Sequence, residues 1–280
     1  MIIHNKNFNI MQIADSGQCF RMKRVEDGCG RAKYSLVAYG RYLELIQISE
    51  EVVELSCSKE EYEQIWEDYF DLSYDYGRIA DSLIEGDDEF LKEAAQFGRG
   101  IRILRQEPFE AMISFIISQN KNIPAIKSCI EGICERYGEK KLNKECGTAY
   151  TAFPAPERLA EAAGEELRAL KAGYRDEYIQ KAAQAVMLGY LDFSYLKECS
   201  FEETVRILKG IRGIGDKVAN CISLYGLHHI EGFPVDVWIL RVLREIYYNR
   251  FDKTKYEGYS GIVQQYMFYY IRHLRGADRS

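Results

Sequence analysis

The segment LKGIRGIGDKVANCISLYGL, residues 208–227, contains two helical patterns separated by a turn that is rich in glycine. Gly213 and Gly215 allow positive φ and let another backbone approach closely. The second helix then begins with unpaired N–H groups, which can bind a phosphate. We therefore interpret the segment as a helix-hairpin-helix, a unit with which a protein can hold a DNA backbone.

Lys217 lies in the first turn of the second predicted helix. The helix dipole disfavours a cation there, so the position is poor for stability but suits a nucleophilic amine. Further along, GFPVDVWILRVL (232–243) places Pro234 where a helix begins and Asp236 in its first turn. Asp236 could simply cap that helix, but its apolar neighbours favour a carboxylate that stabilises a developing cation or moves a proton. We take Lys217 and Asp236 as the candidate catalytic pair.

The composition limits the class of protein. With 280 residues and 47% hydrophobic content, the chain can bury a sizeable core in one or two domains. Its N-terminus lacks a secretory pattern, and no stretch approaches the roughly 18 apolar residues of a membrane span, so we expect a soluble, cytoplasmic protein. The net charge of −6 has the wrong sign for coating nucleic acid non-specifically. Any DNA binding therefore has to rest on local features.

The eight cysteines indicate neither disulfides nor a metal site. A chain of this length without a secretory signal usually keeps its thiols reduced. Cys129 and Cys134 lie close together in a helical pattern and the others are scattered, so the paired C-x-x-C signature of zinc or an iron–sulfur cluster is missing. We therefore expect no metal and no cofactor. The scattered cysteines are Cys19, Cys29, Cys57, Cys146, Cys199 and Cys221.

Periodicity predicts an α+β fold. Between residues 34 and 57, Val53, Leu55 and Cys57 alternate with polar residues, which indicates an antiparallel sheet. After residue 90 the pattern becomes helical, first in PFEAMISFIISQ (108–119) and NIPAIKSCIEGICERYG (122–138). We predict an N-terminal sheet-containing domain at 1–105 and a mostly α-helical helix-hairpin-helix domain at 106–280. Helices are expected near 60–70 and 87–97, and then at 155–171, 176–190, 201–211, 215–228, 234–248 and 258–275.

These motifs resemble those of a known enzyme family. GIGDKVANCISLYG (213–226) followed by FPVDVW (233–238) resembles the helix-hairpin-helix, Gly/Pro-rich loop and aspartate signature of the DNA glycosylase superfamily. DSGQCFR (15–21), GIRILRQEPFEAMISFIISQNKNI (100–123) and AGYRDEYI (172–179) resemble the 8-oxoguanine DNA glycosylase family, so the resemblance covers nearly the whole chain. No cysteine follows Cys221, which argues against the iron–sulfur branch of the superfamily.

The resemblance implies a bacterial-type, monomeric DNA glycosylase with an attached lyase activity, acting on double-stranded DNA that contains oxidised guanine. Such an enzyme flips the damaged nucleotide out of the stack into a pocket. Lys217 would attack C1′, expel the base and form a Schiff base, from which β-elimination cuts the strand on the 3′ side. Asp236 would stabilise the positive sugar and help to prepare the lysine.

The resemblance also assigns residues to the damaged base. Gly17 matches the glycine whose carbonyl accepts a hydrogen bond from N7, which changes from acceptor to donor in 8-oxoguanine. Gln264 and Phe268 share one face of the last helix and match the amide that reads the base edge and the aromatic ring that stacks on the base. Cys221 matches the residue on the other face of the base. Taken singly, each of these residues would be read as a turn glycine or as core packing.

Other positions match DNA-contacting residues of the family. Asn120 would enter the gap left by the flipped base, and Tyr174 and Arg175 would wedge the stack and hold the partner base. Gly213 and Gly215 would present backbone to the DNA. Two positions depart from the eukaryotic branch, which has an arginine where this chain has Ala125 and a phosphate-contacting histidine where it has Trp238. Trp238 can donate one N–H or stack, or it can belong to the core.

Two other functions stay open from the sequence. A non-catalytic helix-hairpin-helix DNA-binding protein would have no reason to keep both Lys217 and Asp236. A glycosylase for another damaged base is the second alternative, although the alkyl-purine members generally lack the lysine and many pyrimidine members carry the cluster that is missing here.

Overall fold

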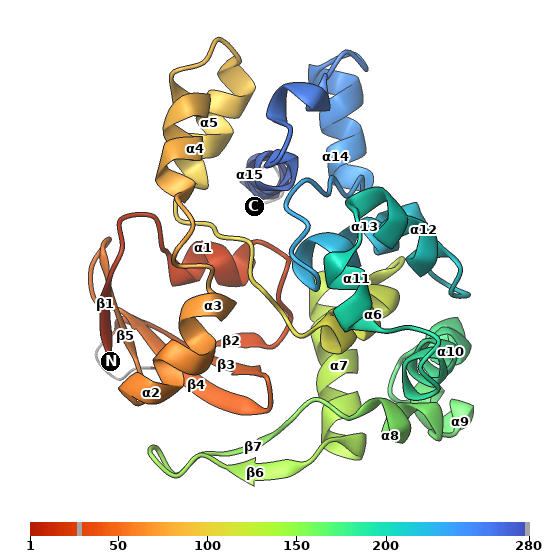
Figure 1. Cartoon of the computed structure of the whole chain (residues 1–280). Helices are drawn as coiled ribbons and strands as arrows, with labels where there is room; N and C mark the ends of the chain where they lie inside the picture. Colours follow the sequence, from red (N-terminus) through yellow and green to blue (C-terminus); the bar gives the residue numbers. More distant parts are fainter. Residues whose placement is uncertain (27–29, 278–280) are drawn as a thin grey trace.

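The computed structural model describes residues 1–26 and 30–277, so Cys29 lies outside the described residues. Five strands near the N-terminus form one antiparallel sheet in the order β1-β5-β4-β3-β2 (Figure 1). Val53 and Leu55 are buried while Glu54 between them is exposed, which confirms the predicted alternation. The strands are β1 (Ile2–His4), β2 (Met22–Val25), β3 (Ala32–Ala38), β4 (Arg41–Gln47) and β5 (Val52–Leu55).

Short helices cover one face of this sheet. The first is α1 (Ile10–Asp15), which begins at its cap Asn9. A second helical stretch consists of α2 (Lys59–Glu61), a π-helical turn (Tyr62–Trp66) and α3 (Glu67–Tyr69), and it agrees with the helix predicted near 60–70. Trp66 is completely buried against the sheet, with the Tyr69 ring centroid 5.7 Å from its own. The sheet and these helices thus enclose one hydrophobic core.

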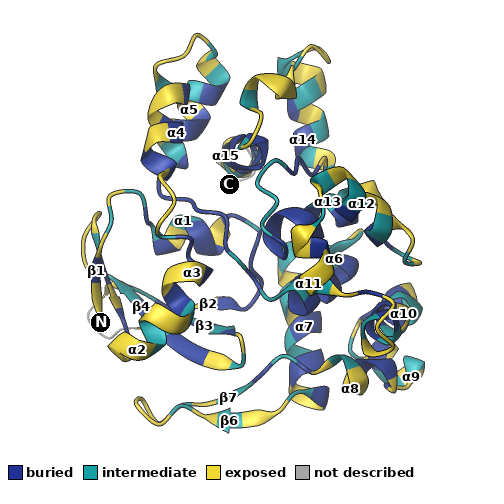
Figure 2. Ribbon diagram, viewed as in Figure 1, coloured by how far each residue is buried: buried dark blue, intermediate teal, exposed yellow. Residues whose placement is uncertain are grey.

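The remaining helices form a second, larger core (Figures 1 and 2). At its centre, α6 is buried on all sides: every residue from Phe109 to Ile117 is buried, and all but Glu110 and Ser114 are apolar. Together with the sheet, this confirms the α+β class. The helices are α4 (Tyr76–Ile84), α5 (Glu89–Phe97), α6 (Pro108–Ser118), α7 (Ile123–Tyr137), α8 (Pro156–Ala160), α9 (Gly164–Ala169), α10 (Asp176–Met187), α11 (Phe193–Glu198), α12 (Phe201–Lys209), α13 (Asp216–Tyr225), α14 (Val237–Arg241) and α15 (Ser260–Ala277).

Several expected element bounds are wrong. The helix predicted at 155–171 is two helices, α8 and α9, separated by a break at residues 161–163. The helix predicted at 234–248 begins only at Val237, and after Arg241 it continues as a π-helical turn (Val242–Ile246). Helices α4 and α11 were not predicted, and neither was a short hairpin formed by β6 (Lys140–Leu142) and β7 (Ala149–Thr151).

The two cores do not divide the chain at a single residue. Helices α4 and α5 precede residue 105 but pack with the helical core, where the ring of Phe97 stacks on Tyr269 of α15 at a centroid distance of 5.1 Å. Conversely, β6–β7 belongs to the helical part but lies along the sheet, and Tyr150 donates a hydrogen bond to the Gly40 carbonyl, 3.1 Å away. The division at 105/106 stays a prediction. Among the described residues, no helix combines the length and apolar character needed to cross a bilayer.

Candidate active site

The predicted helix-hairpin-helix is present as α12 and α13, joined by residues 210–215. Gly213 has a φ of +91°, and a Cβ added there would lie 2.3 Å from the ring of Tyr178, so only glycine fits this approach. Gly215, the N-cap of α13, is exposed and has no atom within 4 Å of an added Cβ. The hairpin therefore leaves Gly215 and Asp216 exposed at the start of α13, and no described residue accepts a hydrogen bond from the backbone N–H groups of residues 216–218.

Lys217 is the second residue of α13, as the sequence predicted. Its Nζ donates a hydrogen bond to the hydroxyl of Ser118, 3.1 Å away, at the end of α6. The same nitrogen lies 5.4 Å from the centroid of the Phe115 ring, one turn earlier on α6. Because Lys217 is half-buried between α6 and α13, its amine points into the molecule rather than into bulk solvent.

Asp236 is the N-cap of α14 and not a residue of its first turn, which corrects the sequence-based placement. Its Oδ1 accepts hydrogen bonds from the backbone N–H groups of Trp238 (3.0 Å) and Ile239 (2.9 Å). Burial raises the pKa of Asp236 above its ordinary value, although these two N–H groups and the charge of Lys217 act in the opposite direction. The capping function is therefore real, and since Oδ1 serves it, Oδ2 is the oxygen left for other partners.

Lys217 and Asp236 both line two adjoining spaces. The outer cleft has a volume of about 930 Å³ and runs between the end of α6, the start of α13, the Asp236 loop and α15. Behind it lies an inner cavity of about 50 Å³. The inner cavity is lined by Gly17, Phe115, Lys217, Cys221, Tyr225, Pro234, Asp236, Gln264 and Phe268.

The inner cavity gathers every residue that the sequence assigned to the damaged base. Gly17 has a φ of +76°, and a Cβ added there would lie 2.9 Å from Cε1 of Phe268, so the ring packs directly on the glycine backbone. Gln264 is buried; its Nε2 donates to the Pro234 carbonyl at 3.1 Å, whereas its Oε1 has no hydrogen-bond partner within the described part of the chain. Cys221 is buried, and burial raises the pKa of its thiol.

Gly17 reaches this cavity from the N-terminal part of the chain because its neighbour Gln18 is bonded to the segment that links the two cores. The Gln18 side chain donates to the Arg102 carbonyl (2.9 Å) and accepts from the N–H of Leu104 (2.8 Å), much as a neighbouring strand would. Gln265 of α15 donates to the Ser16 carbonyl at 2.7 Å. These buried bonds hold the Gly17 backbone against α15.

Of the residues assigned to the DNA strands, Asn120, Gly215 and Trp238 line the outer cleft, whereas Gly213, Tyr174 and Arg175 do not. Asn120 is exposed with a φ of +51°, and its Nδ2 donates to the Tyr174 hydroxyl at 3.2 Å. Arg175 is only 4% exposed; it lies 4.3 Å from the Tyr174 ring centroid and donates to the carbonyl of Gln119. Trp238 is half-buried; it packs against the helical core and also lines the outer cleft.

Two family models match consecutive parts of the chain. Residues 1–112 match the N-terminal domain of 8-oxoguanine DNA glycosylase, and residues 113–259 match the HhH-GPD superfamily of base excision DNA repair proteins. The probable N-glycosylase/DNA lyase of Methanothermobacter thermautotrophicus is 30% identical over 239 residues, which cover 75% of this chain and 75% of that protein. The chain belongs to the 8-oxoguanine DNA glycosylase family.

The resemblance predicted from the sequence is thereby confirmed. The N-glycosylase/DNA lyase of Saccharomyces cerevisiae is 36% identical over 191 residues, but the chain spans only about half of that relative, 50% of its length. Among solved structures, the 8-oxoguanine glycosylase/lyase of Clostridium acetobutylicum, in complex with double-stranded DNA containing cytosine opposite 8-oxoguanine, superposes with a TM-score of 0.89. It is 36% identical, and the match covers 98% of each chain.

Sequence reasoning missed three members of this glycosylase site. Ser118 and Phe115 contact Lys217, and Arg272 of α15 lines the outer cleft beside Phe268. The first two lie in the quoted stretch 100–123, so their place shortly before Asn120 could have drawn attention to them. Arg272 carries no such signal, because only the packing of α15 brings it to the cleft.

The structure offers this glycosylase no metal site: among the described residues, no cluster of three His, Cys, Asp or Glu side chains is placed to hold an ion.

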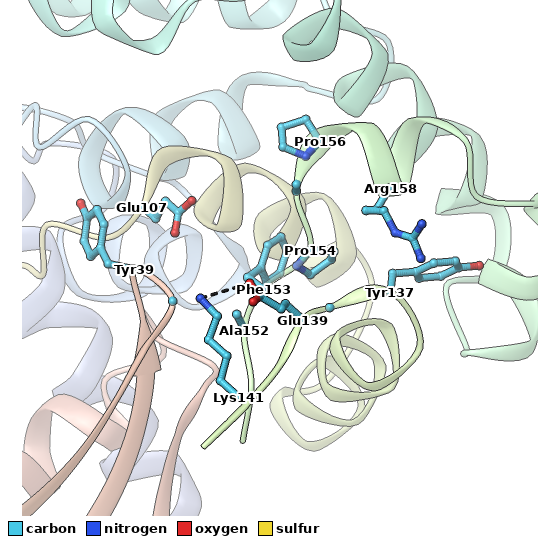
Figure 3. A pocket seen from close by; sticks show the side chains of 13 residues that line it. Tyr39, Glu107, Tyr137, Glu139, Lys141, Ala152, Phe153, Pro154, Pro156 and Arg158 are labelled. Atoms are coloured by element: carbon cyan, nitrogen blue, oxygen red, sulfur yellow. Dashed lines mark ion pairs between the residues drawn. The ribbon is translucent and has the colours of Figure 1, made fainter. Parts of the chain in front are cut away.

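A second cavity of about 670 Å³ lies between the β3–β4 turn, β6–β7 and α8 (Figure 3). Tyr39, Glu107, Lys141, Phe153 and Arg158 line it. None of the predicted site residues borders this cavity.

Proposed function

We propose that this chain excises 8-oxoguanine from double-stranded DNA and then cuts the strand at the abasic site, with Lys217 as the nucleophile. One observation carries the proposal: an amine and a carboxylate share the inner cavity with a carbonyl that accepts no hydrogen bond from the described residues, a partly unbonded amide and an aromatic ring. A DNA-binding module would need only the hairpin, so this convergence favours the enzyme over the non-catalytic alternative.

The chemistry follows from the two charged residues. The uncharged amine of Lys217 forms a bond to C1′ while the bond from C1′ to the base breaks and its electron pair leaves with the base. Loss of the nitrogen proton and opening of the sugar give a Schiff base. Removal of a C2′ proton then expels the 3′ oxygen, which cuts the strand. Asp236 is negative and close to the reacting carbon, so it stabilises the positive charge that builds up on the sugar.

Recognition of the base rests on two groups without protein partners. The carbonyls of Ser16 and Gln18 accept hydrogen bonds from Gln265 and Gln106, whereas that of Gly17 accepts none from the described residues. It is therefore available to the N7–H of 8-oxoguanine, a donor that guanine lacks. The buried Oε1 of Gln264 is likewise free, and leaving it unpaired costs about 1 to 3 kcal/mol, so a base edge that donates to it is favoured.

The Phe268 ring lies on the Gly17 backbone and narrows the inner cavity, whose volume is about 50 Å³ against about 930 Å³ for the outer cleft. Phe268 therefore has to leave Gly17 when the base enters, and it can then stack on the base, with Cys221 on the other side. This movement makes the ring part of recognition rather than a passive wall.

The rim of the outer cleft is proposed to hold the DNA. Asn120 and Tyr174 are exposed and joined by a hydrogen bond, so they can enter the gap left by the flipped base together. Arg175 holds the backbone of this loop and reaches the partner base after a small rotation away from the Gln119 carbonyl. The N–H groups that follow Gly213 and Gly215 bind a phosphate, and Trp238 lies along the same strand.

The proposal is tested by trapping the Schiff base. Borohydride should link the wild-type protein covalently to a duplex with 8-oxoguanine opposite cytosine, and Lys217→Gln should abolish the link. Lys121→Gln is the matched control, because Lys121 lines the same cleft while its Nζ bonds to the Lys171 carbonyl. Undiminished trapping by Lys217→Gln would show that another amine reacts.

The same experiment separates the alternatives. Duplexes with an alkylated purine or an oxidised pyrimidine in place of 8-oxoguanine should give little base release, whereas a glycosylase for another lesion would prefer one of them. A non-catalytic protein would bind all duplexes and release no base. We also propose that the protein acts as a monomer, for which sedimentation of the complex with DNA should give one chain per duplex.

A further inference from the structure

Arg272 is a cation in the outer cleft that none of the functions described so far uses. It lies on α15 one helical turn after Phe268, so both side chains project from the same face. Its guanidinium carbon is 5.2 Å from the Phe268 ring centroid, and Nη1 donates to the Asp15 carbonyl at 2.9 Å. Arg272 lines the outer cleft together with Lys217 and Asp236.

The charge of Arg272 has no ion-pair partner. Among the described residues, no carboxylate lies within 4.0 Å of its guanidinium, although the side chain is half-buried. Burial lowers the pKa of Arg272 below its ordinary value, while the charges of Asp15 and Asp236 act in the opposite direction from further away. A half-buried cation without a paired anion is unfavourable, so an anionic ligand that completes the pair is favoured.

The geometry of the guanidinium selects the kind of anion. It carries five N–H donors in a planar fork that matches the oxygens of a phosphate, and the Asp15 carbonyl uses only one of its nitrogens. A DNA strand that delivers one nucleotide to Lys217 has to bring the phosphates of that nucleotide to the mouth of the same cleft. Trp238, which also lines this cleft, has a single N–H to offer.

We propose that Arg272 binds a phosphate next to the flipped nucleotide and, through its contact with Phe268, couples the hold on the strand to the closure of the base pocket. This inference rests on the proposed function. It also accounts for how a chain with a net charge of −6 holds DNA at this point, since the attraction has to come from individual cations that are left unpaired.

The test compares the DNA affinity of the wild-type protein with that of Arg272→Gln and Arg272→Lys. The probe is a duplex with a tetrahydrofuran abasic analogue, which the protein cannot cleave, and affinity is measured by fluorescence anisotropy over a range of KCl concentrations. Arg272→Gln should bind about 10- to 100-fold more weakly at low salt, as expected for a lost charge-assisted hydrogen bond. The slope of log K against log salt should fall by about 0.9. Arg272→Lys should recover most of this slope.

Arg275→Gln is the matched control on the same helix. Arg275 is exposed and already paired with Glu245 at 2.9 Å, so its removal should leave affinity and salt slope as in the wild type. Thermal unfolding of each variant reports whether the fold is intact. Since Arg272→Lys keeps the charge and the long stem, it keeps the proposal testable if Arg272→Gln is poorly folded.

Neutral methylphosphonates, placed singly on either side of the analogue, identify the phosphate. At the contacted phosphate, the substitution should weaken wild-type binding but should add no further loss in Arg272→Gln. An unchanged salt slope in Arg272→Gln, or equal losses for both proteins at every phosphate, would overturn the proposal and leave Arg272 as a support for Phe268. Wild-type protein that binds the analogue no better than undamaged duplex would overturn the proposed function as well, so the two failures are distinguishable.

Discussion

Replacing Gly17 by alanine tests whether the close contact between Gly17 and Phe268 shapes the base pocket. Two effects are separable in the structure. The φ of +76° belongs to the left-handed region, where a non-glycine residue costs roughly 1 to 2 kcal/mol. The new Cβ would also lie 2.9 Å from Cε1 and 3.3 Å from Cζ of Phe268, shorter than the 3.5 to 4.0 Å at which carbon atoms usually attract one another.

The ring therefore has to move by somewhat less than about 1 Å, into the inner cavity or toward Arg272. Overpacking of this kind costs about 1 to 3 kcal/mol, so the total loss of unfolding free energy is about 2 to 5 kcal/mol. For catalysis, a misplacement of about 1 Å reduces the rate on the order of 100-fold. We expect that reduction in the rate of base release, because the methyl group and the displaced ring occupy space that the base needs.

Gly189→Ala is the matched control. Gly189 also has a positive φ, +72°, but no atom lies within 4 Å of a Cβ added there, so the variant carries the backbone cost without the contact. Urea unfolding gives the stability of both variants, and single-turnover base release from an 8-oxoguanine:cytosine duplex gives the rate. Gly189→Ala should lose about 1 to 2 kcal/mol and keep the wild-type rate. Base release by Gly17→Ala at the wild-type rate would refute the idea that this contact shapes the pocket.

Three further predictions concern charge and recognition. Asp236→Asn keeps the helix cap, so DNA affinity should remain while base release slows by about 100- to 1000-fold; near-wild-type turnover of this variant would make Asp236 purely structural. In the wild type, the rate should fall as the pH drops through the pKa of Asp236, which lies above the ordinary 3.8. Ala125 offers no donor at a position where an arginine contact is worth roughly 5- to 150-fold. Replacing the cytosine opposite the lesion by another base should therefore lower the single-turnover rate only slightly, and Ala125→Arg should raise the preference for cytosine. A wild-type preference for cytosine above about a thousandfold would contradict this argument. Burial raises the pKa of Glu110 from 4.5 to about 8, so between these two pH values the folded protein holds a proton that the unfolded chain has lost. The free energy of unfolding should therefore fall with rising pH by at most about 1.4 kcal/mol per pH unit. Urea unfolding of Glu110→Gln should not show this slope, and an unchanged slope in the variant would assign it to another group.

The helix-hairpin-helix could be predicted almost to the residue, because its signals are local. The expected helices at 201–211 and 215–228 correspond to α12 and α13, since glycines at 213 and 215 force the turn and no tertiary contact is needed to see it. The candidate catalytic pair is proposed for a related reason. Lys217 stands at a helix start that disfavours a cation, which is an anomaly readable from sequence.

Elements that depend on distant partners could not be predicted. The strands of β6–β7 have three residues each, too few for a periodic signal, and the hairpin is held by Tyr150, whose ring is 5.6 Å from that of Tyr42 on the sheet. The alanine-rich stretch 155–171 has high helix propensity, yet it breaks where an added Cβ on Gly164 would lie 3.0 Å from Asp176 of α10. Packing overrides propensity here.

The site shows the same limit. Ser118 reaches Lys217 only after α6 and α13 have packed, so their spacing in sequence carries no information about this contact. Arg272 shares a face of α15 with Phe268, but only the packing of α15 brings that face to the outer cleft. The unbonded Oε1 of Gln264 is also invisible in sequence, because an unsatisfied polar atom is a property of its surroundings. The sequence could match Gln264 to a family position but could not say which of its atoms was free.

The hydrogen bonds between Gln18 and the backbone of residues 102 and 104 affect the order in which the protein loses its functions on heating. They hold the Gly17 loop, which is proposed to read the base, against the part of the protein that carries Lys217, and local unfolding in proteins begins where few such hydrogen bonds exist. If these hydrogen bonds break before the helix-hairpin-helix unfolds, Lys217 remains able to react with a sugar that has already lost its base. A partly unfolded protein would then still cut abasic DNA although it no longer recognises 8-oxoguanine, so lesion recognition would be lost at a lower temperature than strand cleavage.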